Sequence, residues 1–88
     1  METRYRTSFQ RDLKRIKDKT LLVQVRQVIA QIKQAKSLNE IPNLRKLKGF
    51  DTFYRIRLGD YRIGIEVESD TVIFTRLLHR KDIYRYFP

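Results

Sequence analysis

Two short alternating segments, separated by a two-residue turn signal, constrain the fold of this chain more than any other feature. Residues 53–58 alternate between apolar or aromatic and basic side chains, Gly59 and Asp60 follow, and residues 61–65 alternate again. Glycine accepts the positive φ that tight hairpin turns require, so this pattern predicts an antiparallel β-hairpin. One face of that hairpin is apolar and is expected to join the core; it comprises Tyr54, Ile56, Leu58, Tyr61, Ile63 and Ile65.

The opposite face of the predicted hairpin gathers arginine side chains. Pairing across the turn places Arg57 opposite Arg62, and Arg55 opposite the bare backbone of Gly64. Like charges directly opposite one another destabilise a sheet by roughly 0.2–1 kcal/mol per pair, so a polyanion that binds the cluster is the simplest reason to keep it. The alternative is a solvated sheet face on which nearby glutamates neutralise the arginines.

Positive charge is spread over the whole chain rather than confined to one terminal arm. The 88 residues include 20 Lys and Arg against 10 Asp and Glu, which gives a net charge of +10 at pH 7. With 41% hydrophobic residues the chain can still bury a core, so it is not a disordered basic tail. We expect one folded domain over residues 1–88, with a positive surface that binds nucleic acid or an acidic protein.

Several functional classes are excluded by residues that the chain lacks. There is no cysteine and His79 is the single histidine, which excludes disulfides, cysteine-based zinc sites and histidine-rich metal sites. No apolar run approaches the ~18 residues of a membrane span, and neither an apolar signal segment nor a basic amphipathic segment with an aromatic face is present. We therefore expect a cytoplasmic protein that needs no metal or other cofactor and binds no membrane.

Helical spacing of apolar residues marks the first half of the chain. Residues 8–17 show this spacing behind a Thr7–Gln10 capping box, and a longer helix follows a break at residues 18–20. The apolar stripe of the second helix runs from Leu21 to Ala35, with glutamine and lysine on the opposite face. We expect an antiparallel helical hairpin, preceded by a short edge strand over residues 3–6.

The second half of the chain predicts a sheet. Residues 44–48 fit a short strand or an extended lead-in to the arginine hairpin, and residues 71–79 fit a strand that is apolar on both faces. If Ser69 and Asp70 form a clean two-residue loop, His79 shares the face of Arg62, whereas a β-bulge would reverse this. The expected class is α+β, with an N-terminal helical hairpin packed on one face of an antiparallel sheet and a basic face left open.

These segments also carry a resemblance to a known family. In order they are the helical hairpin, Asn43-Leu44-Arg45-Lys46-Leu47-Lys48-Gly49, Tyr54-Arg55-Ile56-Arg57-Leu58, Asp60-Tyr61-Arg62-Ile63 and Leu78-His79-Arg80-Lys81-Asp82-Ile83-Tyr84. Together they resemble the RelE/ParE toxin superfamily over nearly the whole chain. The resemblance implies the toxin of a type II toxin–antitoxin system, held inactive by a cognate acidic, RelB-like antitoxin. RelE-like members cut messenger RNA in the ribosomal A site, whereas ParE-like members inhibit DNA gyrase.

We favour the RelE-like branch, because suitable side chains occupy its basic and aromatic positions. The resemblance then implies a metal-independent endoribonuclease, with ribosome and messenger RNA as partners. The catalytic residues that it implies are Arg55, Arg57, Arg62, Arg80 and Tyr84, the tyrosine stacking on a base. Further contacts with RNA are expected from Arg45, Lys46, Lys48, Lys81, Arg85 and Tyr86. ParE-like gyrase inhibition and a basic RNA-binding module without catalysis stay open as alternatives.

The general base is expected to lie outside the arginine cluster. The best-known family pattern has lysines where this chain has Arg55 and Arg57, and arginine, with an ordinary pKa above ~12, effectively cannot lose its proton. Histidine is the side chain whose ordinary pKa, about 6.5, suits proton transfer near neutrality, so we expect His79 to be catalytic. The alternatives are that His79 only caps the strand end, that Glu66 is the base, or that the ribosome supplies the group.

Overall fold

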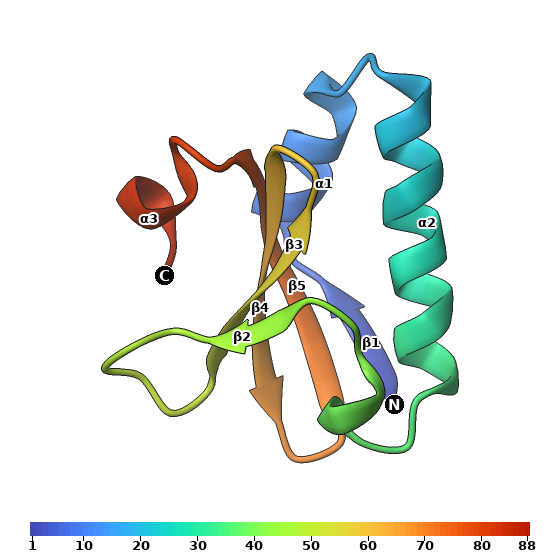
Figure 1. Cartoon of the computed structure of the whole chain (residues 1–88), viewed down its shortest axis with the longest axis vertical. Coiled ribbons are helices and arrows are strands. Elements are labelled where there is room, and N and C mark those ends of the chain that lie inside the picture. Colours follow the sequence, from blue (N-terminus) through green and yellow to red (C-terminus); the bar gives the residue numbers. More distant parts are fainter.

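Five strands form one sheet, with helices α1 and α2 on one side and the short helix α3 on the other (Figure 1). The computed structural model describes all 88 residues. In chain order the elements are β1 (Glu2–Tyr5), α1 (Thr7–Arg15), α2 (Lys19–Gln34), the 3₁₀-helix η1 (Leu38–Glu40), β2 (Leu44–Lys46), β3 (Phe53–Leu58), β4 (Tyr61–Glu68), β5 (Thr71–His79) and α3 (Ile83–Tyr86). The strand order is β1-β5-β4-β3-β2, which confirms the predicted α+β class.

The sheet is mixed, which corrects the antiparallel sheet expected from the sequence. β1 runs parallel to β5, with Tyr5 beside Phe74, while the other neighbouring strands pair antiparallel. The edge strand expected over residues 3–6 is confirmed as β1, so the helices that were expected to form an N-terminal hairpin come after a strand of the sheet. A short alternating segment cannot reveal the direction of its partner, because side chains alternate between faces in either orientation.

Capping explains where α2 begins, and it corrects the prediction for α1. Thr7 is not the N-cap of α1, since the flanking residue is Arg6, whose side chain makes no capping hydrogen bond. By contrast, the Asp18 carboxylate accepts hydrogen bonds from the backbone N–H groups of Thr20 (2.9 Å) and Leu21 (3.3 Å). Such a cap stabilises a helix by about 1 kcal/mol. The aspartate that interrupts the apolar pattern is thus the residue that starts α2.

The main core lies between the sheet and the helices α1 and α2. The apolar face predicted for the hairpin is confirmed, because Ile56, Ile63 and Ile65 are at most 1% exposed. Against them pack buried residues of both helices and β5, namely Phe9, Leu21, Val25, Val28, Ile32, Val72, Phe74 and Leu77. Burial of one such side chain stabilises the fold by about 1.5–3 kcal/mol. This layer therefore fixes which face of the sheet is left for the arginines.

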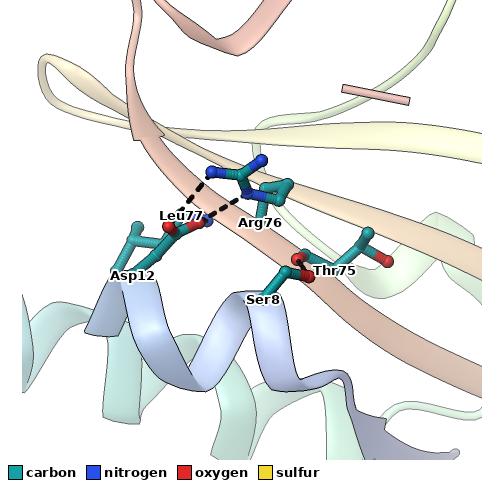
Figure 2. A network of polar contacts seen from close by, with 5 residues as sticks. All are labelled: Ser8, Asp12, Thr75, Arg76 and Leu77. Carbon is teal, nitrogen blue, oxygen red and sulfur yellow. Dashed lines mark hydrogen bonds and ion pairs between the residues drawn. The ribbon is translucent and has the colours of Figure 1, made fainter. Parts of the chain in front are cut away.

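Helix α1 completes the edge of β5 beyond the end of β1 (Figure 2). Ser8 Oγ donates a hydrogen bond to the Thr75 carbonyl oxygen (2.6 Å), and the Leu77 N–H donates one to Asp12 Oδ2 (3.0 Å). The Asp12 carboxylate is 4% exposed and also accepts two bonds from the Arg76 guanidinium, of 2.7 and 3.1 Å. Its buried charge is therefore fully paired, and it ties α1 to the strand that leads into α3.

A second, smaller core lies on the opposite face of the sheet, which was expected to be left open. Leu47, Ile83 and Phe87 are buried there, and Phe53 and Leu78 pack against them. Because Phe53 has the same strand parity as the arginines of β3, this core shares their face. It attaches α3 and the end of the chain beside the arginine cluster.

Candidate functional site

The arginine hairpin has the predicted register. Arg57 lies opposite Arg62 and Arg55 lies opposite Gly64, while the turn glycine has a φ of +60°. β2 contributes a further arginine to the same face, because Arg45 pairs with Arg55. Paired residues project from the same side of a sheet, so these guanidinium groups lie on the face that α1 and α2 leave open.

Three of these arginines line a polar hollow between β2 and β3. The cavity has a volume of about 280 Å³ and is bounded by Arg45, Arg55 and Arg57 together with Asn43 and Leu44. Asn43 adopts a left-handed backbone conformation (φ +63°), and its carbonyl oxygen accepts a hydrogen bond of 3.1 Å from the Arg57 N–H. This bond holds the start of β2 against β3. Guanidinium groups bind phosphate through charge-assisted, often bidentate hydrogen bonds, so the hollow suits a phosphate group.

The arginine cluster has no acidic counter-ion. No carboxylate oxygen lies within 4.0 Å of the guanidinium nitrogens of Arg55, Arg57 or Arg62. Glu66 shares this face, but it pairs with Arg6 instead, at 3.2 Å. The glutamates therefore do not neutralise the cluster, and its positive charge is left for a ligand.

Arg62 lies at the electrostatic centre of the cluster. Its Nη1 donates hydrogen bonds to two carbonyl oxygens of the hairpin turn, at 2.8 and 2.9 Å. Burial lowers the pKa of Arg62, and the positive charge of Arg55 lowers it further. Tyr84 opposes this shift in the pKa, while Arg57 and Arg80 add to it. The structure thus brings the predicted arginines and Tyr84 close to one another, and a bound anion would relieve the repulsion among the arginines.

The two tyrosines of α3 differ in their surroundings. Tyr84 is 63% exposed and is the tyrosine that affects the pKa of Arg62. The Tyr86 ring, by contrast, has the guanidinium carbons of Arg76 and Arg85 each 5.9 Å from its centroid. Such cation–π contacts engage the face of an aromatic ring. Tyr84 is therefore the tyrosine with a free ring beside the arginine cluster.

The other predicted RNA contacts are exposed lysines and arginines. Lys48, Lys81 and Arg85 are exposed, and Lys46 makes an exposed ion pair of 3.7 Å with Asp51. Exposed pairs of this kind contribute only about 0–1 kcal/mol. These side chains therefore remain available to a polyanion.

His79 lies on the opposite side of the sheet from the arginines. β5 contains a β-bulge at Thr75, because adjacent residues of β4 pair with the residues on either side of it. The bulge places His79 opposite Tyr61, which packs against the main core. Of the two placements that the sequence left open, the structure has the one with a β-bulge, so His79 does not share the arginine face; its catalytic role stays a prediction. Its ring packs edge-to-face on Tyr61, with centroids 5.5 Å apart, and its Nδ1 accepts a hydrogen bond from the Lys81 N–H (3.1 Å).

Two features around the site escaped the sequence analysis. The ring of Phe87 covers Gly64 so closely that a Cβ there would lie 2.8 Å from its atoms, and the expected bare backbone is closed. The only signal was the spacing of Ile83 and Phe87, which places both on one side of a helical turn. The pair of Asp12 and Arg76 left no local signal, because 64 residues separate its members.

Two further observations concern other kinds of site. No helix combines the length and the apolar character needed to cross a membrane. No three His, Asp or Glu side chains gather into a group that could hold a metal ion. The groups that do gather, on the arginine face, are guanidinium groups and a phenol ring, which bind phosphate and stack on bases.

Comparison with known proteins places this fold and site in a class. Residues 3–84 match the family model described as the ParE toxin of the type II toxin–antitoxin system parDE. The chain is also 43% identical to Toxin RelE3 of Methanocaldococcus jannaschii, over 100% of both proteins. The class is therefore that of the toxins of type II toxin–antitoxin systems. Within it, this chain belongs to the RelE/ParE toxin family, which confirms the resemblance seen in its motifs.

Solved structures agree with this assignment. A chain of the RelB–RelE antitoxin–toxin complex from Methanococcus jannaschii has a TM-score of 0.82 and 42% identity, covering 97% of this chain and 99% of that one. A chain of the RelBE2 toxin–antitoxin complex from Mycobacterium tuberculosis has a TM-score of 0.68 and 22% identity, and the match covers 90% of this chain and 96% of that one. A chain of the YoeB dimer from Staphylococcus aureus has a TM-score of 0.73 and 17% identity, and the match covers 90% of this chain and 95% of that one. The last two support the fold alone.

Proposed function

We propose that this toxin is a ribosome-dependent endoribonuclease that cleaves messenger RNA in the A site and so arrests translation in the cytoplasm. The observation that carries the proposal is the convergence of Arg55, Arg57 and Arg62 on one sheet face without an acidic partner. A surface that only binds a protein does not require phosphate-binding groups to converge in this way. The 43% identity to a protein named as a RelE toxin supports the same activity.

The proposed chemistry assigns charge stabilisation to the arginines. In the proposed cleavage the 2′-oxygen loses its proton and bonds to the adjacent phosphorus, and the bond from phosphorus to the 5′-oxygen breaks as that oxygen takes up a proton. The phosphorane between these steps carries additional negative charge, which Arg55, Arg57 and Arg62 would stabilise by hydrogen bonds. Arg80 would approach from the start of the turn before α3. Guanidinium groups do not release protons at physiological pH, so the proton transfers fall to groups outside this set. No protein-bound metal ion is required in this proposal, because the guanidinium groups take the stabilising role.

We propose that Tyr84 holds the substrate by stacking on a base. Its ring is largely exposed, and base–aromatic stacking contributes about 1–3 kcal/mol per base. The phosphates on either side would contact the predicted RNA-binding residues Arg45, Lys46, Lys48, Lys81 and Arg85. Tyr86 would have a smaller part, because guanidinium groups already approach its ring.

An acidic, RelB-like antitoxin is the proposed neutralising partner. The toxin carries a net charge of +10, and a chain of 42% identity was solved in the RelB–RelE antitoxin–toxin complex. Charge complementarity of this kind speeds association and selects the partner. We expect antitoxin and ribosome to exclude one another in a pull-down with purified components. A ternary complex that still cleaves at full rate would contradict this arrangement.

Inhibition of DNA gyrase is the second candidate function, since the matched family model is described as the ParE toxin of the parDE system. Two assays run with the same toxin preparation distinguish the candidates. Toeprinting on translating ribosomes should reveal new 5′ ends within the A-site codon, while gyrase supercoiling should be unaffected. Inhibition of supercoiling without cleavage would assign the gyrase function instead. Binding to RNA without cleavage and without inhibition of supercoiling would instead indicate a basic RNA-binding module with no catalytic activity.

A further inference from the structure

We propose that His79 is a positioning residue, whose Nδ1 atom fixes the turn that carries Arg80 and leads to Tyr84. This inference rests on the proposed function for its effect on cleavage, but the contact itself belongs to the free toxin. It differs from the proton-transfer role expected from the sequence, because it assigns the imidazole ring to the backbone rather than to the substrate.

The turn between β5 and α3 is held by three consecutive backbone N–H groups. The Arg80 N–H donates to the Asp60 carbonyl oxygen (2.7 Å), and the Asp82 N–H donates to the His79 carbonyl oxygen (2.8 Å). Between them, the Lys81 N–H donates to Nδ1 of the His79 ring (3.1 Å). The middle bond is the one that depends on a side chain, so it can be removed by substitution while its neighbours stay. Without it the Lys81 N–H would lose its partner in the turn.

The His79 ring is held in place for this bond. It pairs across the strands with Tyr61 and packs edge-to-face on that ring at 5.5 Å. The charged groups around it are Asp12 and Arg15 of α1 and Asp82 of the turn, which line the same cavity of about 180 Å³. Asp12 is already engaged by Arg76 and by a backbone N–H. None of these contacts directs the ring toward the arginine face.

The turn of residues 80–82 affects where Arg80 and Tyr84 lie, because the helix that follows it, α3, is packed on the sheet at both of its ends. Ile83 is fully buried and Phe87 is 3% exposed, so these two side chains hold α3 against the sheet. Arg80 precedes Ile83 and Tyr84 follows it, and Arg80 is exposed. A catalytic group displaced by about 1 Å can lose about 10²-fold in rate. His79 therefore supplies the contact that sets the approach of these side chains to the cluster.

Two substitutions separate positioning from proton transfer. In His79→Asn the amide oxygen can take the place of Nδ1 and accept from the Lys81 N–H, whereas in His79→Gln the amide lies near the place of Nε2. Neither amide can act as a general base near neutrality. We expect His79→Asn to cleave ribosome-bound messenger RNA at close to the wild-type single-turnover rate, and His79→Gln to be about 10–100-fold slower.

Amide hydrogen exchange of Lys81 in the free toxin provides a readout without ribosomes. Exchange should be about fivefold or more faster in His79→Gln than in wild type, and unchanged in His79→Asn. Equal exchange at Lys81 in all three proteins would overturn the proposal even if the toxin cleaved no RNA. Protected exchange together with a large loss of cleavage in His79→Asn would assign the ring to proton transfer, which also overturns it. A wild-type toxin that does not cleave would instead contradict the proposed function.

Discussion

Substituting Gly64 tests how the end of the chain covers the arginine face. A Cβ at this position would lie 2.8 Å from Cγ, Cδ1 and Cδ2 of Phe87, closer than such atoms approach one another. Phe87 is only 3% exposed, so its ring cannot move without leaving the small core that it forms with Leu47 and Ile83. Gly64→Ala should therefore lift the ring from the sheet and loosen α3, including Tyr84.

The expected magnitude follows from two opposing effects. Forcing a methyl group into a packed contact costs about 1–3 kcal/mol. In a strand with open space above it, replacing glycine by alanine would instead stabilise the protein by about 0.5–1 kcal/mol. We therefore expect Gly64→Ala to lower the free energy of unfolding by about 1–2 kcal/mol. In a Phe87→Ala background, where the ring is absent, the same substitution should be neutral or stabilising.

Urea unfolding of the two single variants, the double variant and the wild type provides this comparison. Circular dichroism at a wavelength that reports helix and sheet gives the unfolding free energy of each protein. A cost of Gly64→Ala that is the same with and without Phe87 would refute the proposed contact. So would a stabilising effect in the wild-type background. The double variant thus separates the contact from any general effect of alanine at this position.

Other side chains give shorter tests. Tyr84→Phe should keep most of the cleavage activity because the ring remains, whereas Tyr84→Ala should lose about 1–3 kcal/mol of substrate binding, seen in the concentration dependence of single-turnover cleavage. Asp12→Asn should lower the free energy of unfolding by about 1–3 kcal/mol in urea, since it weakens the bonds to Arg76 and to the Leu77 N–H. Burial and neighbouring guanidinium groups lower the pKa of Arg62, so its charged form is less stable in the folded than in the unfolded chain. At neutral pH Arg62 is charged, so this cost in folding free energy is present. Added salt screens the repulsion and Arg62→Gln removes the charge, so each should leave the melting temperature unchanged or raise it.

The arginine hairpin could be predicted from sequence because its determinants are local. Strict alternation on both sides of Gly59 fixes the register by the period of the strand and the length of the turn. The pairs of Arg57 with Arg62 and of Arg55 with Gly64 follow from that register alone. The burial of the isoleucines on the other face follows from the same alternation of side chains along the two strands. For this part of the site, sequence and structure agree residue by residue.

The features of the fold and site that the sequence did not predict depend on contacts between segments far apart in the chain. The bulge at Thr75 reverses the face of His79, yet the strand pattern around it is apolar on both sides and so cannot reveal the extra residue. The direction of β1 depends on its pairing with β5, which lies at the other end of the sequence. The hydrogen bonds of Asp12 to β5 and the packing of the Phe87 ring on the sheet are likewise tertiary contacts that local periodicity does not encode.

Single-turnover cleavage of messenger RNA on programmed ribosomes tests the central claim most directly, which is that the unpaired arginines bind and stabilise the reacting phosphate. Arg55→Gln, Arg57→Gln and Arg62→Gln are compared with Arg26→Gln, which removes one charge from an exposed position on α2. We expect each cluster variant to lose about 10²–10³-fold in rate while remaining folded, and the control to match the wild type. Cleavage at the wild-type rate by the three folded cluster variants would contradict the account.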